Sequence, residues 1–575
     1  MTRPPTRSER QQRLKTRALP LIAIALVAFI LGVIQGCPGD PNRSAAERYV
    51  AAWSKGDYGA MYEELSATSR EAIAVEQFKE RYAESVAMAT MTSLTGGEAG
   101  GDETEAEVPV KVRTRAFGTV VSPMNFSFGE DGIAWQDSLL FPGLKPDEEL
   151  SRKTEMPRRA PILAADGRAM AEGPSLAREH PLGDAMIDVT GLVGTPEEES
   201  DLTDLALGFD PGEPTGISGL ELAFNERLSG KPGGTLMAVP IKGGDGGKGR
   251  DLATGEPAPA DPLKTTIDPT LQDSAVSNLA GQLGGVALLD AKKGRIKAMA
   301  GQAYSVLQPP GSTMKMVTAT AALETGKATL DSEYPFVTEA PADGRMIRNA
   351  YNEVCGGNLV ESFAHSCNSV FAPLGMEIGE EAMTETAEKY GFNKVPAMFN
   401  EAGTAAVDPP IPTIPQPGEY NNELGVSAIG QGKVQATPLL MASIAQTIAN
   451  GGKLMPTPLT TEPELQPEAQ PVRVSSAKTA NQLTQMMVAV VTSGTGPAAA
   501  IPEAQVAGKT GTAELGSSGS TDGEGQPILD VDAWFAGFAP ADKPRLAVAV
   551  MLIEADADGG TVAAPIAGAV LSAGL

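Results

Sequence analysis

The segment Pro309-Pro-Gly-Ser-Thr-Met-Lys315 runs into MVTATAALETG and joins a loop to a helix. Two prolines and a glycine end the loop, and the Ala- and Met-rich run after them has strong helix propensity. We therefore expect Ser312 at a helix N-terminus and Lys315 one turn later on the same face. A lysine whose pKa is lowered by burial can be the base for a serine hydroxyl, and a helix N-terminus favours an oxyanion. The segment predicts a nucleophilic serine with a lysine base.

Two further short motifs follow along the chain. Ser366-Cys-Asn368 lies in LVESFAHSCNSVFAPLG, on or beside a predicted helix. Lys509-Thr-Gly-Thr512 follows QVAG in a predicted strand, which can present a lysine and two threonine hydroxyls to a carboxylate. Each motif alone is weak evidence, because serines and asparagines commonly cap helices and KTGT can be a hairpin edge. The prediction depends on their occurring together in this order.

The ordered set S-x-x-K, S-x-N and K-T-G resembles the motifs of penicillin-binding proteins and serine β-lactamases. Residues 263–575 resemble the transpeptidase domain of that family, also through Gly430-Gln-Gly-Lys-Val-Gln-Ala-Thr-Pro438 and Asp532-Ala-Trp-Phe-Ala-Gly-Phe538. The resemblance implies an antiparallel sheet flanked by helices. Cys367 at the centre of S-x-N departs from other relatives, and we expect it not to affect the chemistry.

The resemblance also implies a role for each motif residue. Ser312 would attack the D-Ala–D-Ala carbonyl of a peptidoglycan stem peptide, Lys315 would take its proton, and Ser366 would relay a proton to the departing D-Ala. Five residues would bind the donor peptide: Asn368, Lys509, Thr510, Gly511 and Thr512. The backbone N–H groups of Ser312 and Thr512 would form the oxyanion hole. β-Lactams would mimic the donor and acylate the same serine.

Two regions precede the transpeptidase domain. Residues 40–148 open with apolar residues at helical spacing (Ala46, Tyr49, Val50 and Trp53) and continue with strand-like alternation. This order of elements resembles the NTF2-like domain of some penicillin-binding proteins. Residues 149–262 resemble the family's dimerisation or linker module through Gly219-Leu-Glu221 and Leu228-Ser-Gly-Lys-Pro-Gly233. The expected architecture is therefore a multidomain α+β protein.

The N-terminus has the pattern of a membrane anchor. Residues 1–17 hold six basic residues against one acid, and the apolar run ALPLIAIALVAFILGVI follows. We expect a cytoplasmic tail at 1–17, a transmembrane anchor or lipoprotein signal segment at 18–36, and extracytoplasmic domains after it. Ile34-Gln-Gly-Cys37 resembles a lipobox, in which Cys37 would be acylated. A signal-anchor helix with an incidental cysteine is the alternative, and both place the protein on the same membrane.

Charge and composition narrow the range of partners and cofactors. The net charge of −27 argues against a nucleic-acid partner. The three cysteines and two histidines lack metal-ligand spacing, so no metal or cofactor is expected, and His365 is expected to pack rather than catalyse. In an oxidising compartment we expect a disulfide between Cys355 and Cys367, with two buried free thiols as the alternative.

Three other functions fit parts of the pattern. A β-lactamase would need a carboxylate that activates a deacylating water, and no trustworthy motif supplies one. A β-lactam sensor would need a transmitting domain beyond a tail of 17 residues. A non-catalytic division scaffold would not need the intact motif set. A transpeptidase is therefore expected, acting on stem peptides at the membrane, with other cell-wall synthesis or division proteins as further candidate partners.

Overall fold

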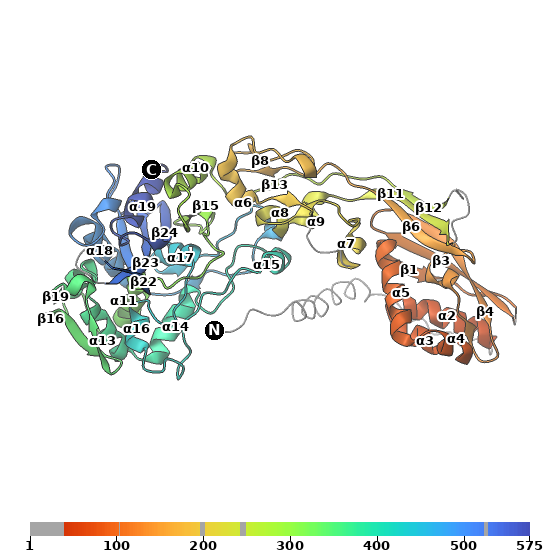
Figure 1. Cartoon of the computed structure of the whole chain (residues 1–575), viewed down its shortest axis with the longest axis horizontal. Helices are drawn as coiled ribbons and strands as arrows, with labels where there is room; N and C mark the ends of the chain where they lie inside the picture. The colour runs from red at the N-terminus through yellow and green to blue at the C-terminus, as the bar shows by residue number, and fades with distance from the viewer. Residues whose placement is uncertain (1–39, 103, 196–201, 242–248, 522–526) are drawn as a thin grey trace. The chain divides into compact units, whose positions relative to one another are not determined.

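The computed structural model describes residues 40–102, 104–195, 202–241, 249–521 and 527–575. The chain divides into two compact units (Figure 1). The first comprises Met1–Ala160, Gly194–Thr215 and Glu226–Asp261, and the second comprises Pro161–Val193, Gly216–Asn225 and Pro262–Leu575. The anchor expected at 18–36 and Cys37 lie outside the described residues. Within the described part of the chain, no helix is both long and apolar enough to cross a membrane.

Helices packed on an antiparallel sheet build the core of the first unit. The helices are α2 Pro41–Trp53, α3 Tyr58–Glu63, α4 Ala67–Ala72 and α5 Val75–Met88. The sheet has the order β1-β3-β4-β5 with β2 beside β3, and its strands are β1 Met91–Gly96, β2 Gly100–Gly101, β3 Glu105–Thr114, β4 Thr119–Phe128 and β5 Ile133–Ala134. The Asp40 side chain caps α2 by accepting from Asn42 N–H. Every second side chain of β3 is buried, so one face of the sheet meets the helices.

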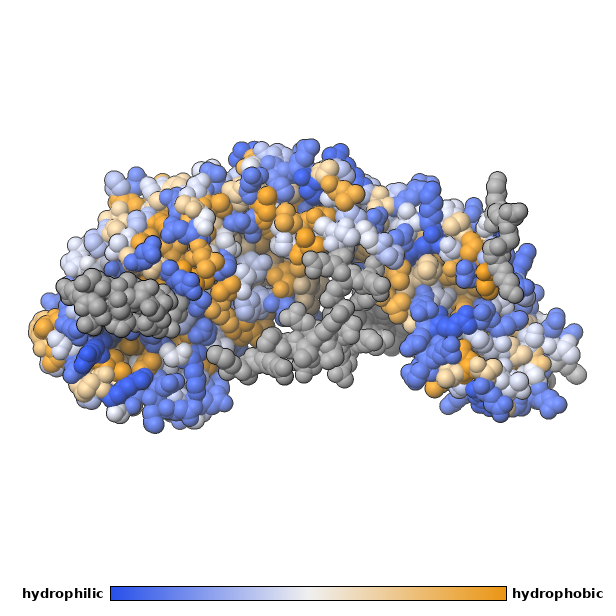
Figure 2. Space-filling view, viewed as in Figure 1, coloured by the Kyte–Doolittle hydropathy of each residue, from blue (hydrophilic) through white to orange (hydrophobic). Residues whose placement is uncertain are grey.

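Aromatic side chains fill the interior of this unit. Tyr49 and Trp53 of α2 and Phe78 and Tyr82 of α5 are fully buried. The Tyr49 and Tyr82 hydroxyls lie 2.5 Å apart, and Tyr82 donates to Leu139 O at 2.7 Å. The rings of Trp53 and Tyr82 meet edge to face with centroids 5.2 Å apart. Hydrophilic residues dominate the visible outer face of these helices (Figure 2). The apolar residues at helical spacing in the sequence are therefore those that face the interior.

A second sheet of the first unit has the order β12-β11-β6, with β6 Glu148–Glu155, β11 Gly233–Pro240 and β12 Arg250–Gly255. Leu236 and Ala238 of β11 belong to the same hydrophobic core as α2 and α5. Strand β11 therefore completes the core of the segment that precedes residue 149. Residues 149–262, where the dimerisation or linker module is expected, contribute to both compact units.

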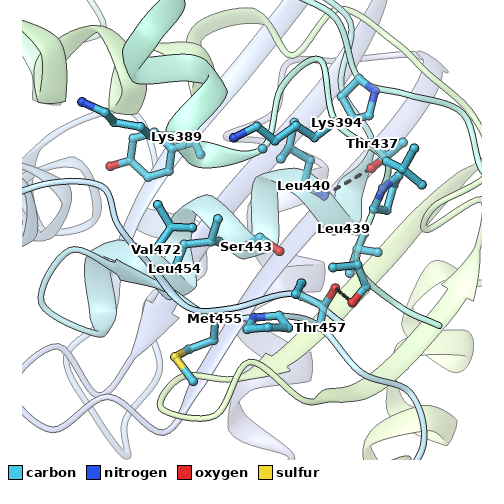
Figure 3. Close-up of a pocket in the computed structure, with 18 of the residues that line it drawn as sticks. Lys389, Lys394, Thr437, Leu439, Leu440, Ser443, Leu454, Met455, Thr457 and Val472 are labelled. Atoms are coloured by element: carbon cyan, nitrogen blue, oxygen red, sulfur yellow. Dashed lines mark hydrogen bonds between the residues drawn. The ribbon is translucent and has the colours of Figure 1, made fainter. Parts of the chain in front are cut away.

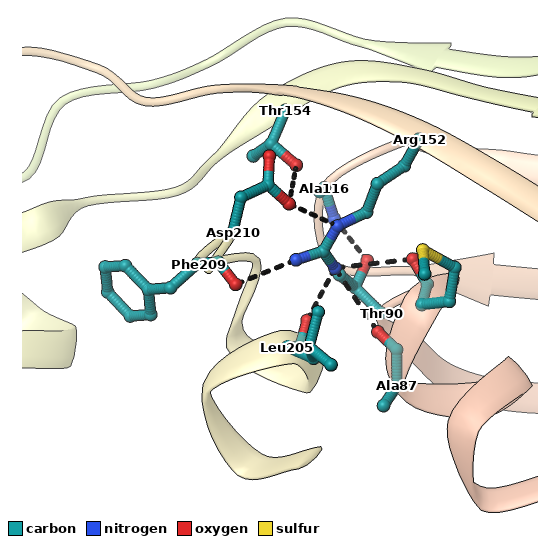
Figure 4. Close-up of polar contacts among 9 residues, drawn as sticks. Ala87, Thr90, Ala116, Arg152, Thr154, Leu205, Phe209 and Asp210 are labelled. Carbon is teal, nitrogen blue, oxygen red and sulfur yellow. Dashed lines mark hydrogen bonds and ion pairs between the residues drawn. The ribbon is translucent and has the colours of Figure 1, made fainter. Parts of the chain in front are cut away.

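Arg152 of β6 ties three segments of the first unit together (Figure 4). Its side chain is 2% exposed, and Nε donates to Asp210 Oδ1 at 2.7 Å. Nη1 donates to Leu205 O at 2.7 Å near the end of α7 Leu202–Leu207, and it lies 3.4 Å from Ala87 O at the end of α5. The last carbonyls of a helix have no partner within the helix and carry partial negative charge. One guanidinium therefore caps two helix ends at once.

The second unit is built on a five-stranded antiparallel sheet of order β15-β14-β24-β23-β22. Its strands are β14 Gly284–Asp290, β15 Ile296–Gly301, β22 Ala507–Thr521, β23 Pro527–Ala539 and β24 Leu546–Ala555. Ala533 and Phe535 share a core with α10 Pro269–Leu279 and α19 Ala563–Ser572. The alternate residue Trp534 points to the opposite face, and α17 Pro438–Ala449 packs on this sheet as well. The sheet flanked by helices is the architecture expected for 263–575.

Further helices and short strands complete the second unit. The helices include α6 Ile187–Thr190, α8 Gly219–Ala223, α11 Lys315–Glu324, α12 Leu359–Ala364, α13 Asn368–Ile378, α14 Glu380–Tyr390, α15 Glu401–Val407, α16 Leu424–Ala428 and α18 Ala477–Ser493. Short strand groups are β7 Ile162–Leu163 with β8 Ala169–Ala171 and β13 Leu263–Lys264, β16 Glu333–Val337 with β19 Cys355–Asn358, β17 Glu339–Ala342 with β18 Arg345–Arg348, and β20 Lys453–Leu454 with β21 Val472–Arg473. The remaining short elements β9 Val193–Gly194, β10 Thr215–Gly216 and α9 Asn225–Ser229 lie where the chain passes between units.

Candidate active site

Ser312 lies in η4 Gly311–Met314, a 3₁₀ turn that continues directly into α11. Lys315 is the first residue of the α-helix, one turn after Ser312, as the sequence pattern predicts. Gly311 has a φ of +52°, and a Cβ at this position would lie 2.6 Å from Thr512 O. Gly311 N–H also donates to Gly430 O at 3.0 Å. A glycine is required here because the turn that carries Ser312 packs against the backbone of β22.

The amine of Lys315 is completely buried at the centre of the site. Its Nζ lies 2.9 Å from Ser312 Oγ, 3.1 Å from Ser366 Oγ, 2.7 Å from Ser366 O and 2.7 Å from Asn368 Oδ1. Burial lowers the pKa of Lys315 well below its ordinary value, and the nearby Lys509 amine lowers it further. Both effects favour the neutral amine, which is the form that can accept a proton.

The partners of this amine also orient it. A neutral amine has two N–H donors and one lone pair. Ser366 O and Asn368 Oδ1 can only accept hydrogen bonds, so they bind the two N–H groups. The lone pair is then left for a hydroxyl, and Ser312 Oγ lies within 2.9 Å. A carbonyl and an amide oxygen therefore direct the lone pair of Lys315 toward the proton of Ser312.

The S-x-N segment turns the chain from α12 into α13. Ser366 has a φ of +60°, and Asn368 is the first residue of α13. Asn368 Nδ2 donates to Arg348 O at 2.9 Å, which leaves Oδ1 for the Lys315 amine. Ser366 and Asn368 are separated from Lys315 by more than fifty positions in the sequence. The structure thus brings four expected residues, Ser312, Lys315, Ser366 and Asn368, into one hydrogen-bonded cluster.

A disulfide joins Cys367, in the middle of S-x-N, to Cys355 at the start of β19. This is the pairing expected from their flanking positions, and the Cα atoms are 5.5 Å apart. His365 differs from expectation. Its side chain is 48% exposed and lies 3.5 Å from Glu353, so it neither packs in the core nor contacts the cluster. The reason is that α12 ends at Ala364, and the following residue faces outward at the C-cap.

The KTGT motif forms the start of β22, which is an edge strand of the sheet. Lys509 is fully buried, its Nζ donates to Thr510 O at 3.1 Å, and it lies 5.6 Å from the Phe363 ring centroid. Burial lowers the pKa of Lys509 to about 7. The amine is enclosed by protein in this structure, and its expected contact with a substrate carboxylate stays a prediction. A Cβ on Gly511 would lie 2.7 Å from Pro310 O, so this glycine admits the Ser312 turn.

Sequence reasoning missed Thr495. Its hydroxyl lies 2.6 Å from the Thr510 hydroxyl, and Thr495 N–H donates to Ala364 O at 3.2 Å. Gly559 is a second omission, because its N–H donates to Thr512 Oγ1 at 3.4 Å. The run Ser493-Gly-Thr-Gly496 of small residues after a long helix was the available signal. These contacts fix the two threonine hydroxyls of the motif.

The arrangement supplies a nucleophile, a base and a proton relay for acyl transfer. Among the described residues, no carboxylate hydrogen-bonds to Ser312, Lys315 or Ser366. The same part of the chain holds no group of His, Cys, Asp and Glu residues that could bind a metal ion. The formation of a serine ester is the chemistry that these groups can perform.

Three family profiles match the chain in the order expected. The penicillin binding protein transpeptidase domain matches residues 284–572, which is half of the chain. The NTF2-like N-terminal transpeptidase domain matches 41–148, and the penicillin-binding protein dimerisation domain matches 166–247. The expected fold class and domain order are confirmed by these matches.

Individual relatives agree with the family profiles. Peptidoglycan D,D-transpeptidase PbpA of Mycobacterium tuberculosis (strain CDC 1551 / Oshkosh) is 37% identical over 295 residues, covering 48% of this chain and 56% of that protein. The chain thus spans about half the length of the curated relatives it matches. The D,D-transpeptidase domain of a peptidoglycan glycosyltransferase from Eggerthella lenta is similar in structure, with TM-score 0.56 and 26% identity, covering 72% of this chain and 97% of that chain. The ceftriaxone acyl-enzyme complex of penicillin-binding protein A from M. tuberculosis has TM-score 0.55 and 25% identity, with coverage of 73% and 98%.

Proposed function

Because the chain belongs to the penicillin-binding protein transpeptidase family, we propose that it is a serine D,D-transpeptidase that cross-links peptidoglycan stem peptides. The observation that carries this proposal is the buried Lys315 amine, which lies 2.9 Å from Ser312 Oγ and is oriented by Ser366 O and Asn368 Oδ1. The relatives named peptidoglycan D,D-transpeptidase support the same assignment.

Acylation begins when Lys315 takes the proton of Ser312. The Ser312 Oγ then attacks the carbonyl carbon of the penultimate D-Ala of a stem peptide, and a C–O bond forms. Backbone N–H groups of Ser312 and Thr512 stabilise the oxyanion, where the loss of one such donor costs about 2.7–4 kcal/mol. Ser366, which is 3.1 Å from Lys315 Nζ, passes the proton to the leaving nitrogen. The peptide C–N bond breaks, D-Ala departs, and an ester on Ser312 remains.

The ester is resolved by an amine from a neighbouring stem peptide. Its nitrogen attacks the acyl carbon, its proton returns through the Lys315 and Ser366 pair, and Ser312 is released as the alcohol. Asn368 holds an amide of the donor, and Thr510 and Thr512 bind its terminal carboxylate. Lys509 contributes positive potential from beneath these threonines when it is protonated, and it helps to keep Lys315 neutral.

The same serine is proposed to react with β-lactams. Attack on the strained amide opens the lactam ring without a leaving group, so the acyl-enzyme persists. The ceftriaxone acyl-enzyme complex of the M. tuberculosis relative supports this expectation.

We further propose that the protein works at the cell membrane with its catalytic unit on the extracytoplasmic side. The basic tail at 1–17 and the apolar run that follows support a single-pass or lipid-anchored attachment. The disulfide between Cys355 and Cys367 is in keeping with an oxidising compartment. Other cell-wall synthesis or division proteins are candidate partners of the first unit.

Intact-mass spectrometry after incubation with benzylpenicillin tests the acylating serine, with Ser312→Ala as the matched control. We expect an adduct of one drug mass on the wild-type chain alone, persisting for many minutes. Rapid return to the unmodified mass with consumption of drug would make the protein a β-lactamase. No adduct, together with no cross-linking of purified stem peptides, would leave a non-catalytic scaffold and refute the proposal.

A further inference from the structure

A cavity of about 190 Å³ lies in the second unit (Figure 3), and none of its lining residues belongs to the cluster around Ser312. Its walls come from the end of α14, the following segment 391–397, the first turns of α17, and segments 454–457 and 469–472. All of these segments belong to the same compact unit. None of the lining residues takes part in the proposed transpeptidation.

Most of the lining is apolar. The Tyr390 ring, Leu439, Leu440, Leu454 and Met455 face the space, and Tyr390 is fully buried. For comparison, an engineered apolar cavity of about 150 Å³ in another protein binds benzene. The volume therefore suits one aromatic ring or a branched alkyl group of similar size.

One polar group within the wall has no partner. Ser443 of α17 is 6% exposed, and its hydroxyl makes no hydrogen bond with any described residue. The hydroxyl oxygen itself is not fully buried, so water in the cavity can bind it in the free protein. Figure 3 shows this hydroxyl among the residues that line the cavity. A bound acceptor atom would take the place of that water.

The mouth of the cavity carries two lysines, Lys389 and Lys394. The Lys389 amine forms an ion pair with Glu385 at 2.7 Å. Lys394 has no carboxylate within 4.0 Å among the described residues. The pKa of the nearby Glu388 is lowered mainly by hydrogen bonds from Gln416 and Asn393, and the charge of Lys394 adds a smaller contribution. The Glu388 carboxylate is bound instead by Gln416 and Asn393. One ammonium group is thus available to an anion, in a chain whose net charge is −27.

We infer that this cavity binds a monocarboxylate with a compact apolar body. The apolar body fills the space beside Tyr390 and Leu440, the carboxylate pairs with Lys394, and an acceptor oxygen receives the Ser443 hydroxyl. A single carboxylate matches the single uncommitted ammonium. A cationic ligand would be repelled by Lys394, and a neutral ligand would gain only a weaker hydrogen bond from it.

Two contacts link the wall of the cavity to the chain on either side of Ser312. The Tyr390 hydroxyl lies 2.8 Å from the Thr320 hydroxyl on α11. Ala436, next to the cavity residue Thr437, exchanges two backbone hydrogen bonds with Gln308 at 2.8 and 3.0 Å. A ligand that packs against Tyr390 and Thr437 favours the arrangement in which these contacts are made. The bound carboxylate therefore speeds acylation of Ser312, a regulatory step that rests on the proposed function.

Binding is tested directly on the full chain with 3-phenylpropionate, using isothermal titration calorimetry. 3-Phenylpropionamide, which has the same shape without the charge, is the matched ligand control. We expect saturable binding of the acid, with binding of the amide weaker by about tenfold, a difference typical of one charged contact. Equal binding of the acid and the amide would overturn the proposed site.

Two variants locate the binding. Lys394→Glu should weaken binding of the acid by more than tenfold, and Ser443→Leu should abolish it by filling the cavity. Lys478→Glu, an exposed lysine outside the cavity, makes the same charge change and should leave binding unchanged. If Ser443→Leu fails to fold, Lys394→Glu still decides. Binding that is unchanged by Lys394→Glu, or weakened equally by Lys478→Glu, would refute this location.

The rate of labelling by a fluorescent penicillin tests the regulatory step. Saturating 3-phenylpropionate should raise the acylation rate by about fivefold in wild type and not in Lys394→Glu. A fivefold change is at the low end of the coupling seen between linked binding sites. An unchanged or reduced rate in wild type would overturn the regulation while leaving the binding site standing. A chain that binds the acid but is neither acylated nor able to cross-link purified stem peptides would overturn the proposed function and the regulation together.

Discussion

The aromatic core of the first unit and the catalytic centre of the second both bury large side chains completely, and the energetic consequences are opposite. Tyr49, Trp53 and Tyr82 bury apolar rings, and the two tyrosine hydroxyls keep hydrogen-bond partners. Around Ser312 the buried groups are the amines of Lys315 and Lys509. Burying a ring stabilises the fold, whereas burying an amine favours loss of its proton and costs stability. In the proposed mechanism, this cost is what lets Lys315 act as a base.

Replacing Lys315 by methionine should produce the largest effect. The variant keeps a long apolar side chain but removes the base, so acylation by benzylpenicillin should slow by about 10³-fold or more. Stability should not fall, because no amine remains to be buried. Acylation is measured by intact mass over time, and stability by calorimetry, with the exposed Lys478→Met as control. A variant that acylates as fast as wild type would show that burial of this amine does not supply the base.

Truncating Trp53 to alanine should destabilise the first unit by about 3–5 kcal/mol, because the ring leaves a cavity in a filled core. The second unit has its own core, so acylation of Ser312 should be unchanged. Chemical unfolding followed by tryptophan-independent circular dichroism measures the loss. Phe336→Ala removes an aromatic ring that is 68% exposed and should change stability little. Equal losses of unfolding free energy in the two variants would show that burial of the Trp53 ring does not stabilise the first unit.

Replacing Arg152 by methionine should cost the first unit about 2–3 kcal/mol. Its guanidinium is buried like the lysine amines, yet it is bound by Asp210 and by carbonyls at two helix ends, which then lose their donor. Arg152→Lys should recover only part of this loss, because one ammonium cannot reach all of the acceptors. Hydrogen exchange at the ends of α5 and α7 is the measurement. Unchanged protection in Arg152→Met would mean that the guanidinium does not hold these helix ends.

The pH dependence of stability gives the smallest effect. The unfolded chain binds a proton at Lys509 up to about pH 10, but the folded chain binds it only up to about pH 7. The unfolded state therefore binds more protons between these values, so stability rises with pH across this window. The rise attributable to Lys509 is about 1 kcal/mol between pH 7 and pH 8. Lys509→Met should flatten the rise without removing it, since Lys315 contributes in the same direction. If stability rises as steeply with pH in the variant as in wild type, the lowered pKa of Lys509 is contradicted.

Patterns among residues close in sequence predicted much of the fold and of the site. The spacing of Tyr49, Val50 and Trp53 predicts the buried face of α2, because helix periodicity depends only on near neighbours. The loop-to-helix change at Ser312 predicts η4 and α11 for the same reason. The expected packing of His365 was wrong, because packing depends on which distant segment covers a surface, and the domain boundaries stay predictions. The lipid anchor at Cys37 stays a prediction.

By itself, the sequence determined the residue types that carry the chemistry, their order along the chain and the helix on which the first motif lies. Only the tertiary structure decided how they meet. Ser366 and Asn368 reach Lys315 across more than fifty residues, and Lys509, which follows 194 positions after Lys315, lies close enough to lower its pKa. The same packing buries both amines, adds Thr495 and leaves the Ser443 hydroxyl in a cavity. The physical reason is that a pKa or a cavity depends on desolvation by segments distant in sequence, which no local pattern encodes.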